Sequence, residues 1–352
     1  MKANAWVLVE PGKPLEQRMM NVPTPGAGEA LVEVDACGLC HTDLAYAQGA
    51  VKPRHALPLV LGHEIVGRVI DAGPGAQQWT GRSVIVPAVL PCGDCPFCRA
   101  GRGNACPHQK MPGNDCDGGF ATHVLVPAQP LVSIDDAPAS VDRRELAVVA
   151  DAVSTAYQAL RRAEVRDGDV VFVVGAGGVG GYAVQIARAL GAHTVAIDID
   201  AGKLEAIASH GAERTLAACG RAPKDVRKEA HAIASDWRVP SLRWRVLECS
   251  GTPEGQTLAF TLLAQAATLV QVGYTPDAVS LRLSNVMAFD ATIHGSWGCP
   301  PDAYPHVLSL IYDGRVVLSP FVEHAPMSRV VEWLDAMANH RLTRRLVLNP
   351  EA

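Results

Sequence analysis

The feature that most constrains the fold of this chain lies in residues 170–198. Val170–Val174 is a valine run with one phenylalanine, typical of a buried strand, and it leads directly into a glycine-rich turn. A stretch of helical spacing follows at Gly180–Leu190, and a second apolar run, Thr194–Ile197, ends in Asp198. Strand, turn, helix and strand within about thirty residues predict the first unit of a parallel α/β sheet.

The turn has the glycine spacing of a dinucleotide-binding loop. Such glycines let the backbone approach a pyrophosphate at a helix N-terminus, where unpaired N–H groups favour anions. The turn residues predicted to bind the cofactor are Gly175, Gly177, Gly178, Val179 and Gly180. Asp198 is placed to accept hydrogen bonds from the adenosine ribose, and its charge would repel a 2′-phosphate, so NAD is favoured over NADP. Lys203 either reaches the same ribose or lies on a solvated helix face.

Later segments continue the alternation of strand and helix. These segments are Arg245–Cys249, Gly255–Ala266, Thr268–Gly273 and Ala291–Ser296. Together with the first unit they predict a doubly wound parallel sheet of the Rossmann type. Because ligands bind outside the carboxyl ends of such strands, Val272 and Gly273 are expected beside the nicotinamide.

The N-terminal part of the chain has a different pattern. Short apolar alternations such as Ala5–Val9 and Ala30–Val34 are separated by proline and glycine, as in an antiparallel β region. A single core stops growing at ~250–300 residues, so a chain of 352 residues is expected to form two domains.

Composition and charge exclude several classes of function. The net charge is -5 at pH 7 and no run of Lys and Arg exceeds two residues, so neither nucleic acid nor a membrane surface is an expected partner. No apolar segment reaches the ~20 residues that span a bilayer, and the N-terminus does not resemble a signal peptide, so a cytoplasmic protein is expected. Ten cysteines in a reducing compartment favour metal binding over disulfides.

Four cysteines form the strongest local signal. Cys92, Cys95, Cys98 and Cys106 lie in a segment rich in Gly, Pro and Arg that cannot build a core of its own. Four thiolates on one short loop suit a closed tetrahedral zinc site, in which the ion supplies the order that packing lacks. Two disulfides or an iron–sulfur cluster are the alternatives, but the spacing differs from that of bacterial ferredoxins.

A second set of metal-ligating side chains is more widely spaced. Cys40, His63 and Glu64 offer thiolate, imidazole and carboxylate, which suit a catalytic zinc with an open position, although each is also compatible with an ordinary core residue. Cys37 and Cys40 form a Cys-x-x-Cys, which could be a redox dithiol. The short strands around this motif do not fit a redox fold, so Cys37 is interpreted as a buried structural cysteine.

Asp151 is a candidate for the remaining ligand of that site. The spacing of residues 146–160 predicts a helix with an apolar face, and Asp151 lies in the middle of it. A carboxylate in an apolar stretch costs free energy unless it is paired or bound to a metal. The alternative is a helix N-cap before Val153–Arg161, and the spacing alone leaves both open.

The order of these features resembles the zinc-dependent medium-chain alcohol dehydrogenases over essentially the whole chain. In that family a Cys, a Gly-His-Glu and a four-cysteine lobe precede the dinucleotide-binding fold. The resemblance implies a β-rich, GroES-like catalytic domain of residues 1–152 and 295–352, with a structural zinc lobe at about 91–107. It also implies a Rossmann NAD-binding domain at 153–294, one catalytic and one structural zinc in each chain, and a homodimer or homotetramer.

Positions that match the family suggest roles in catalysis. Cys40, His63 and Asp151 resemble the ligands of the catalytic zinc, and Glu64 resembles a carboxylate that can enter the coordination sphere. Many members carry Cys in place of Asp151, whereas a branch that acts on secondary alcohols carries Asp. The sequence therefore resembles that branch.

Other positions concern protons and phosphates. Thr42 resembles the hydroxyl that starts a proton relay, and Asp43 resembles the acceptor that orients the ligating histidine. His41 and Arg345 resemble basic residues that contact the pyrophosphate, and both are also compatible with surface positions. Plant and animal members complete the relay with a histidine where this chain has Ala45, so the proton is expected to leave by another route.

Two loop segments bear on the substrate. Val84–Cys106 and Gln109–Phe120 resemble the 6-hydroxycyclohex-1-ene-1-carbonyl-CoA dehydrogenases of anaerobic benzoyl-CoA degradation. This implies oxidation of a cyclic secondary alcohol on an acyl-CoA to the 6-oxo compound, with Lys52, Arg54 or Lys110 near the CoA phosphates. A zinc-dependent dehydrogenase of a free cyclic alcohol or polyol is the alternative, and a non-catalytic NAD-binding protein is a more distant one.

Overall fold

The computed structural model describes residues 1–351, which form two compact units. Unit 1 combines the N-terminal part of the chain with two later segments, and unit 2 contains the middle of the chain and one short later segment. The later segments of unit 1 are Gly298–Leu308 and the residues from Leu318 onward, and unit 2 consists of Thr155–Trp297 and Ser309–Val317.

Residues 309–317 belong to unit 2, whereas the sequence analysis expects the whole C-terminal tail, 295–352, in the catalytic domain. The Gln185 side chain accepts a hydrogen bond from the Val317 amide at 2.9 Å and donates one to the Val317 carbonyl at 3.3 Å. Arg315 donates to the carbonyl of Ala189 at 3.3 Å. These bonds hold the segment against the helix that follows the glycine-rich turn.

Unit 1 contains two sheets. The smaller has the strand order β2-β1-β4, and the larger has the order β15-β16-β3-β5-β6-β8, with β7 paired to β3. All neighbouring strands are antiparallel except β15 and β16. The strands are β1 Lys2–Leu8, β2 Glu16–Asn21, β3 Glu29–Gly38, β4 Leu59–Val60, β5 Glu64–Ala72, β6 Ser83–Val86, β7 His123–Pro127, β8 Val132–Ser133, β15 Val322–Pro326 and β16 Arg345–Asn349.

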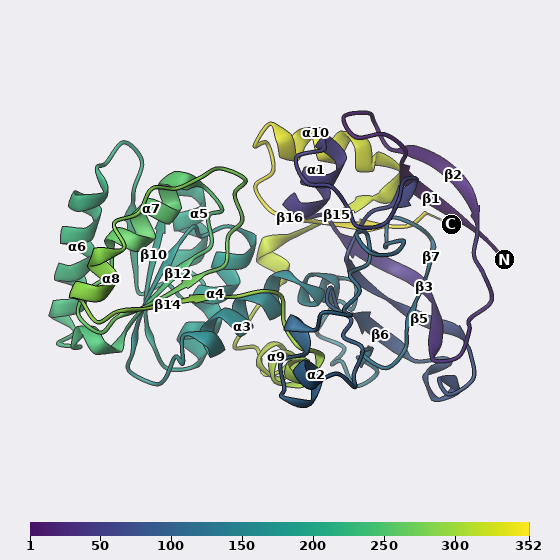
Figure 1. Ribbon diagram of the computed structural model, residues 1–352, viewed down its shortest axis with the longest axis horizontal. Helices are drawn as coiled ribbons and strands as arrows, with labels where there is room; N and C mark the ends of the chain where they lie inside the picture. Colours follow the sequence, from purple (N-terminus) through teal and green to yellow (C-terminus); the bar gives the residue numbers. More distant parts are fainter. Residues whose placement is uncertain (352) are drawn as a thin grey trace. The chain divides into compact units, whose positions relative to one another are not determined.

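The helices of unit 1 are short. Helix α1 (His41–Gln48) ends at Gly49, whose φ of 76° is a left-handed conformation that suits glycine. It packs against α10 (Val330–Ala338), as Figure 1 shows. Helix α2 (Pro96–Arg99) lies in the four-cysteine loop, and α9 (Tyr304–Tyr312) is shared between the two units.

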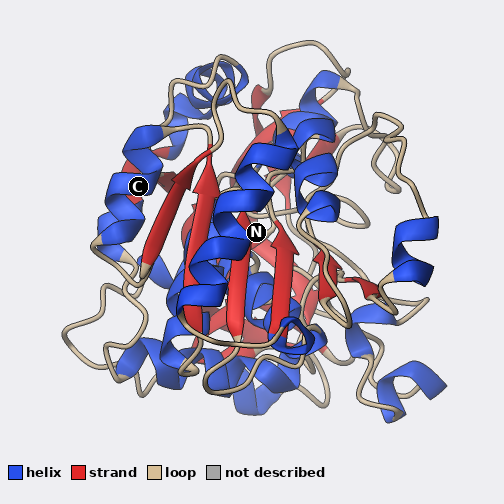
Figure 2. Ribbon diagram, turned by 90° about the vertical axis from the view of Figure 1, so that its left-hand side faces the viewer, coloured by secondary structure: helices blue, strands red, loops and turns tan. Residues whose placement is uncertain are grey.

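Unit 2 is built on six parallel strands in the order β11-β10-β9-β12-β13-β14. All five residues of β9 are buried, as expected for a central strand covered on both faces. Figure 2 shows these strands side by side with helices in front of them. The strands are β9 Val170–Val174, β10 His193–Asp198, β11 Arg214–Ala217, β12 Trp244–Glu248, β13 Thr268–Gln271 and β14 Thr292–Gly295. The helices are α3 Ala152–Arg162, whose first three residues belong to unit 1, α4 Gly178–Ala189, α5 Ala201–Ala208, α6 Pro223–Asp236, α7 Pro253–Thr261 and α8 Ser284–Ala288.

The predicted α/β class is therefore confirmed, with a β-rich unit and a doubly wound parallel sheet. None of the helices between residues 1 and 351 has the length and apolar character needed to cross a bilayer.

Candidate catalytic and structural metal sites

Strand pairing in unit 1 brings Cys40 and His63 together. Gly38, at the end of β3, pairs with Glu64, at the start of β5. Cys40 follows β3 as the N-cap of α1, and His63 immediately precedes β5. Gly62 turns the chain into this position with a φ of 94°, and a Cβ there would lie 2.6 Å from the nearest side-chain atom. The glycine is thus required for the placement of His63.

A buried carboxylate, Asp43, orients the site. It accepts hydrogen bonds from the amides of Cys40 at 3.0 Å and Gly62 at 3.1 Å, and it lies 3.2 Å from Nδ1 of His63. When Nδ1 donates to this carboxylate, the other ring nitrogen, Nε2, presents its lone pair. Nε2 is buried and has no hydrogen-bond partner among the described residues. This is the arrangement of a metal-ligating histidine.

Asp151 interrupts the helix that the sequence predicts over residues 146–160, so that prediction is wrong. The chain forms 3₁₀ turns over Glu145–Ala150, and α3 begins only at Ala152. Asp151 itself has φ −135° and ψ −69°, outside the helical region, and its side chain lies in the cluster.

Four potential ligands meet in one place. An oxygen of Asp151 lies 3.9 Å from Sγ of Cys40 and 3.6 Å from Nε2 of His63. One ligand atom each from Cys40, His63, Glu64 and Asp151 all lie within 4.8 Å of one another. Burial alone would lower the pKa of His63, but Asp43, Asp151 and Cys40 raise it well above its usual value. The cluster therefore attracts positive charge, and its donor atoms suit zinc.

Glu64 has a partner of its own that the sequence analysis did not identify. Nε of Arg345 donates to Glu64 at 2.9 Å, and its Nη2 pairs with the other carboxylate oxygen. Burial raises the pKa of Glu64, and Arg345 opposes this rise. Burial disfavours the charge on Arg345, but Glu64, Cys40 and Asp151 raise its pKa well above the usual range. The ion pair keeps Glu64 beside the cluster, and contact of Arg345 with a pyrophosphate stays a prediction.

Tyr304 is a second residue that the sequence analysis missed. It is 1% exposed, and its hydroxyl donates to the carbonyl of Ala150 at 2.6 Å and accepts from the Ser154 hydroxyl at 3.2 Å. Ser154 also lies 3.1 Å from the carbonyl oxygen of Asp151. Burial raises the pKa of Tyr304 well above its usual value, so the hydroxyl stays protonated. These bonds hold the turn that presents Asp151.

Cys37 does not join the metal cluster. It is fully buried in β3, and added Cβ atoms at Gly62 and Gly119 would lie 2.8 and 2.9 Å from its sulfur. Burial raises the pKa of the Cys37 thiol well above its usual value, which suppresses the thiolate chemistry of a redox site. The interpretation as a structural cysteine fits this environment.

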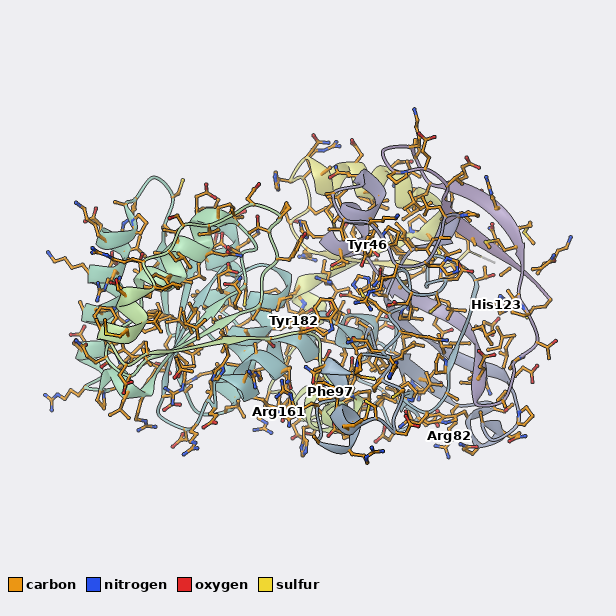
Figure 3. All side chains as sticks on the ribbon, in the orientation of Figure 1. Tyr46, Arg82, Phe97, His123, Arg161 and Tyr182 are labelled. Carbon is orange, nitrogen blue, oxygen red and sulfur yellow. The ribbon has the colours of Figure 1, made fainter. Side chains whose placement is uncertain are left out.

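The other predicted residues of α1 differ in exposure. Oγ1 of Thr42 lies 3.8 Å from Sγ of Cys40, whereas His41 is exposed at the first position of the helix. Tyr46, labelled in Figure 3, follows Thr42 by one helical turn and is buried. Burial raises the pKa of Tyr46 to about 12. The Tyr46 hydroxyl therefore stays protonated near neutral pH, and no tyrosinate is present to accept a proton. Ala45 has no polar side-chain group.

The four-cysteine loop has the dimensions of a zinc site. The sulfur atoms of Cys92 and Cys106 are 3.5 Å apart, and those of Cys95 and Cys98 are also 3.5 Å apart. The Cys95–Cys106 and Cys92–Cys98 separations are 3.7 and 3.9 Å. Four Zn–S bonds of ~2.3 Å at tetrahedral angles require sulfur separations of about 3.8 Å. The loop is therefore arranged to close around one zinc ion.

The glycine-rich turn of unit 2 leaves space where a pyrophosphate is expected. Gly175 has a φ of 91°, and a Cβ there would lie 2.6 Å from the amide nitrogen of Ser250. A Cβ at Gly180 would lie 1.7 Å from the carbonyl oxygen of Gly175, so this glycine allows α4 to pack closely on the turn. A Cβ at Gly177 would meet no atom within 4 Å. The space beside Gly177, at the N-terminus of α4, suits an anion.

The two residues predicted to contact the ribose, Asp198 and Lys203, lie at the end of β10 and in the helix after it. Asp198 ends this strand and accepts hydrogen bonds from the amides of Ala176 at 2.7 Å and Asp200 at 2.9 Å. Its carboxylate thus ties the glycine-rich turn to the end of β10. Lys203 lies half-buried in the first turn of α5, where Asp200 caps its amide.

Val272 and Gly273 follow β13 at the same edge of the sheet. Their amides donate to the carbonyl of Glu248 at 3.0 and 2.9 Å. Because β9, β12 and β13 are neighbouring parallel strands, their carboxyl ends lie together. The structure therefore groups these residues with the glycine-rich turn and Val179.

Known proteins match both units. Residues 26–136 match the family of alcohol dehydrogenase GroES-like domains, and residues 178–313 match the family of zinc-binding dehydrogenases. An alcohol dehydrogenase of Geobacillus stearothermophilus is 30% identical over 349 residues, which cover 98% of each chain. The chain belongs to the zinc-binding alcohol dehydrogenase family.

Solved structures support the same assignment. A cobalt- and zinc-bound alcohol dehydrogenase from Pyrobaculum aerophilum is 28% identical with a TM-score of 0.85, covering 99% of this chain and 100% of that one. Acetophenone reductase from Geotrichum candidum in complex with NAD is 25% identical with a TM-score of 0.85, covering 99% and 97%. The predicted GroES-like and Rossmann folds, the oxidoreductase class and the cofactors zinc and NAD are confirmed. The non-catalytic alternative is set aside.

Proposed function

We propose that this chain oxidises a secondary alcohol to a ketone with hydride transfer to NAD, and that the alcohol is 6-hydroxycyclohex-1-ene-1-carbonyl-CoA. The first part is carried by the position of Asp151, whose carboxylate lies 3.9 Å from the Cys40 thiol and 3.6 Å from Nε2 of His63. A carboxylate in this place is the feature by which the chain resembles the secondary-alcohol branch of its family.

The charges of the ligands and of a zinc ion balance in the proposed metal site. Cys40, His63 and Asp151 would hold the zinc, which supplies Lewis acidity toward the substrate oxygen. The thiolate and the carboxylate together match the charge of a divalent cation, while Arg345 neutralises Glu64. Neutrality favours an uncharged alcohol group in the remaining position, because no further charge has to be buried.

The proton and the hydride leave the alcohol by separate routes. Thr42 lies beside Cys40 and accepts the hydroxyl proton at Oγ1 as it passes its own proton to water, since Ala45 offers no further acceptor. NAD held by the glycine-rich turn would supply the acceptor for the carbinol hydrogen and its two electrons, which would leave the C–O bond as a carbonyl. The products are the ketone, NADH and one proton.

The acyl-CoA part of the proposal is supported by the loops near the site. The amide of Arg54 donates to the side chain of Asn114 at 3.0 Å, so the segment after α1 is joined to loop 109–120. Lys52, Arg54 and Lys110 are all exposed along these two segments. Exposed cations of this kind are suited to the phosphates of coenzyme A. The Arg54 guanidinium is exposed and lies 3.5 Å from the partly buried Asp115, a long contact of low energy that a phosphate can displace.

The test is the rate of NADH formation with a panel of alcohols. The panel contains the proposed CoA ester, its free acid, cyclohexanol and a polyol. We expect kcat/KM for the CoA ester to exceed that for the free acid about 100-fold, because binding of the remote CoA part contributes to the transition state. Equal values for the ester and the free acid would remove the acyl-CoA part of the proposal.

Substitution of the basic residues gives a second readout. Replacing Lys52, Arg54 and Lys110 together by Ala is expected to raise KM for the CoA ester about tenfold and to leave KM for NAD unchanged. Lys13→Ala, an exposed lysine of the same unit, is the matched control. A similar effect of Lys13→Ala would mean that net charge, rather than a phosphate contact, is responsible.

A free cyclic alcohol or polyol is the second candidate substrate. It is favoured by the acetophenone reductase described above, whose name specifies a ketone without coenzyme A. Higher kcat/KM for cyclohexanol or the polyol than for the CoA ester would establish this candidate.

A further inference from the structure

A buried carboxylate in unit 2, Glu248, is used by none of the features described so far. It ends β12 and is 0% exposed. Within residues 1–351 no Lys, Arg or His forms an ion pair with it. An unpaired buried carboxylate is costly, so its hydrogen bonds must compensate for the lost hydration.

Those hydrogen bonds all come from two neighbouring segments. One carboxylate oxygen accepts from the amides of Ser250 at 2.7 Å and Gly251 at 3.2 Å, and it also pairs with the Ser250 hydroxyl. The other oxygen accepts from Nε2 of Gln271 at 2.7 Å. The same Gln271 nitrogen donates to the carbonyl of Gly273 at 2.7 Å. Glu248 therefore joins the loop after β12 to the end of β13.

The position of Glu248 in the sheet is where a dinucleotide is expected. The strand order reverses between β9 and β12, and ligands bind outside the carboxyl ends of strands at such a point. Glu248 pairs with Val174, the last residue of β9, on one side and with Gln271 on the other.

The segments around Glu248 leave no room for rearrangement. A Cβ at Gly273 would lie 2.3 Å from the amide nitrogen of Gly251 and 2.6 Å from a Glu248 carboxylate oxygen. A Cβ at Gly175, in the glycine-rich turn, would lie 2.6 Å from the amide nitrogen of Ser250. A shift of the Ser250–Gly251 loop would therefore move both the turn and the end of β13.

We propose that Glu248 is a positioning residue for NAD. Its carboxylate fixes the loop after β12 and the Gln271–Gly273 segment, and through them the glycine-rich turn, in the conformation that receives the dinucleotide. The proposal concerns cofactor binding alone and does not depend on which alcohol is oxidised.

The first experiment is Glu248→Gln, with the Kd for NADH measured by fluorescence titration. The substitution keeps the size of the side chain, but its amide group would face Nε2 of Gln271, so two donors would meet. We expect the Kd for NADH to rise about tenfold, the equivalent of one buried hydrogen bond. An unchanged Kd would overturn the proposal.

A double variant separates the specific contact from a general disturbance. In Glu248→Gln with Gln271→Glu, donor and acceptor are exchanged, so the hydrogen bond between the two side chains is restored while the bond from residue 271 to the Gly273 carbonyl stays lost. We expect the Kd to recover by at least about threefold relative to Glu248→Gln. Recovery supports the proposal, and a Kd at or above that of Glu248→Gln contradicts it. If Glu248→Gln does not fold, Gln271→Ala replaces it in the test. This variant removes the same hydrogen bond between residues 248 and 271 and is expected to raise the Kd for NADH as well.

A second buried carboxylate in unit 2 provides the structural control. Asp169 precedes β9 at the opposite end of the sheet, is 1% exposed and pairs with Arg243 at 2.8 Å. Asp169→Asn is expected to lower the Tm and to leave the Kd for NADH unchanged. If Asp169→Asn raised the Kd as much as Glu248→Gln does, the effect would be one of stability and the positioning role would be rejected.

Discussion

At the scale of single residues, Asp43 controls the geometry of the metal cluster. We expect Asp43→Asn to lower zinc affinity and kcat/KM by about 10–100-fold, the usual range for a partner that orients a ligating histidine. Asn has only one acceptor oxygen, so it cannot accept from Cys40, Gly62 and His63 as the carboxylate does. Zinc content after dialysis and kcat/KM measure the effect. Asp71→Asn, at an exposed position of β5, should match the wild type in both.

Tyr304 offers a test of the turn that presents Asp151. Tyr304→Phe removes the hydroxyl that bonds to Ala150 and Ser154. The Ala150 carbonyl keeps a bond from the amide of Ala88 at 3.0 Å, so the expected loss in the free energy of unfolding is limited to about 1–2 kcal/mol. Thermal or urea unfolding measures it. Because Asp151 loses part of its support, kcat/KM should fall while KM for NAD stays the same; a change in KM for NAD alone would contradict this role.

At the scale of secondary-structure elements, the turn between β9 and α4 contains two glycines with different tasks. Gly180→Ala places a Cβ 1.7 Å from the Gly175 carbonyl oxygen, so we expect α4 to be displaced and the Tm to fall. Gly177→Ala meets no atom within 4 Å and has a φ of −76°, so its Tm should equal that of the wild type. Its methyl group occupies the space left for the pyrophosphate, and the Kd for NADH should rise. Equal Tm values for both variants would show that close packing is not the reason for Gly180.

The two site elements that the sequence signals most strongly are both local. The glycine-rich turn and the four-cysteine loop each lie within a short segment, so their spacing already specifies which atoms meet. The pairing of Glu64 with Arg345 spans 281 residues and depends on β16 joining the sheet beside β3. A periodic pattern contains no information about that register, and the pairing could not be predicted for this reason.

The break at Asp151 could not be predicted because tertiary contacts outweigh local propensity there. The apolar spacing of residues 146–160 is compatible with one helix, and no proline or glycine interrupts it. The turn is held instead by Tyr304, which is 150 residues from Ser154 in the chain. Helix propensities amount to tenths of a kcal/mol per residue, so a few buried hydrogen bonds are enough to override them.

At the scale of the whole molecule, unit 1 is assembled from both ends of the chain. Strand β16 pairs with β3, and α10 packs against α1, which begins directly after Cys40. The C-terminal segment thus supplies Arg345 to the cluster and a helix to the core. The candidate metal cluster is completed only when residues from the N-terminal and C-terminal parts of the chain are in place.

The two metal sites should respond independently to substitution, because they are built from separate sets of side chains. Elemental analysis is expected to find about two zinc ions per chain in the wild type and about one in either Cys92→Ser or His63→Ala. Cys92→Ser should lower the Tm, since the four-cysteine loop has no apolar core to replace the ion, whereas His63→Ala should abolish activity. A wild type with a single zinc that persists in Cys92→Ser and is lost in His63→Ala would contradict the structural site, because the spacing of the four sulfur atoms would then have another cause.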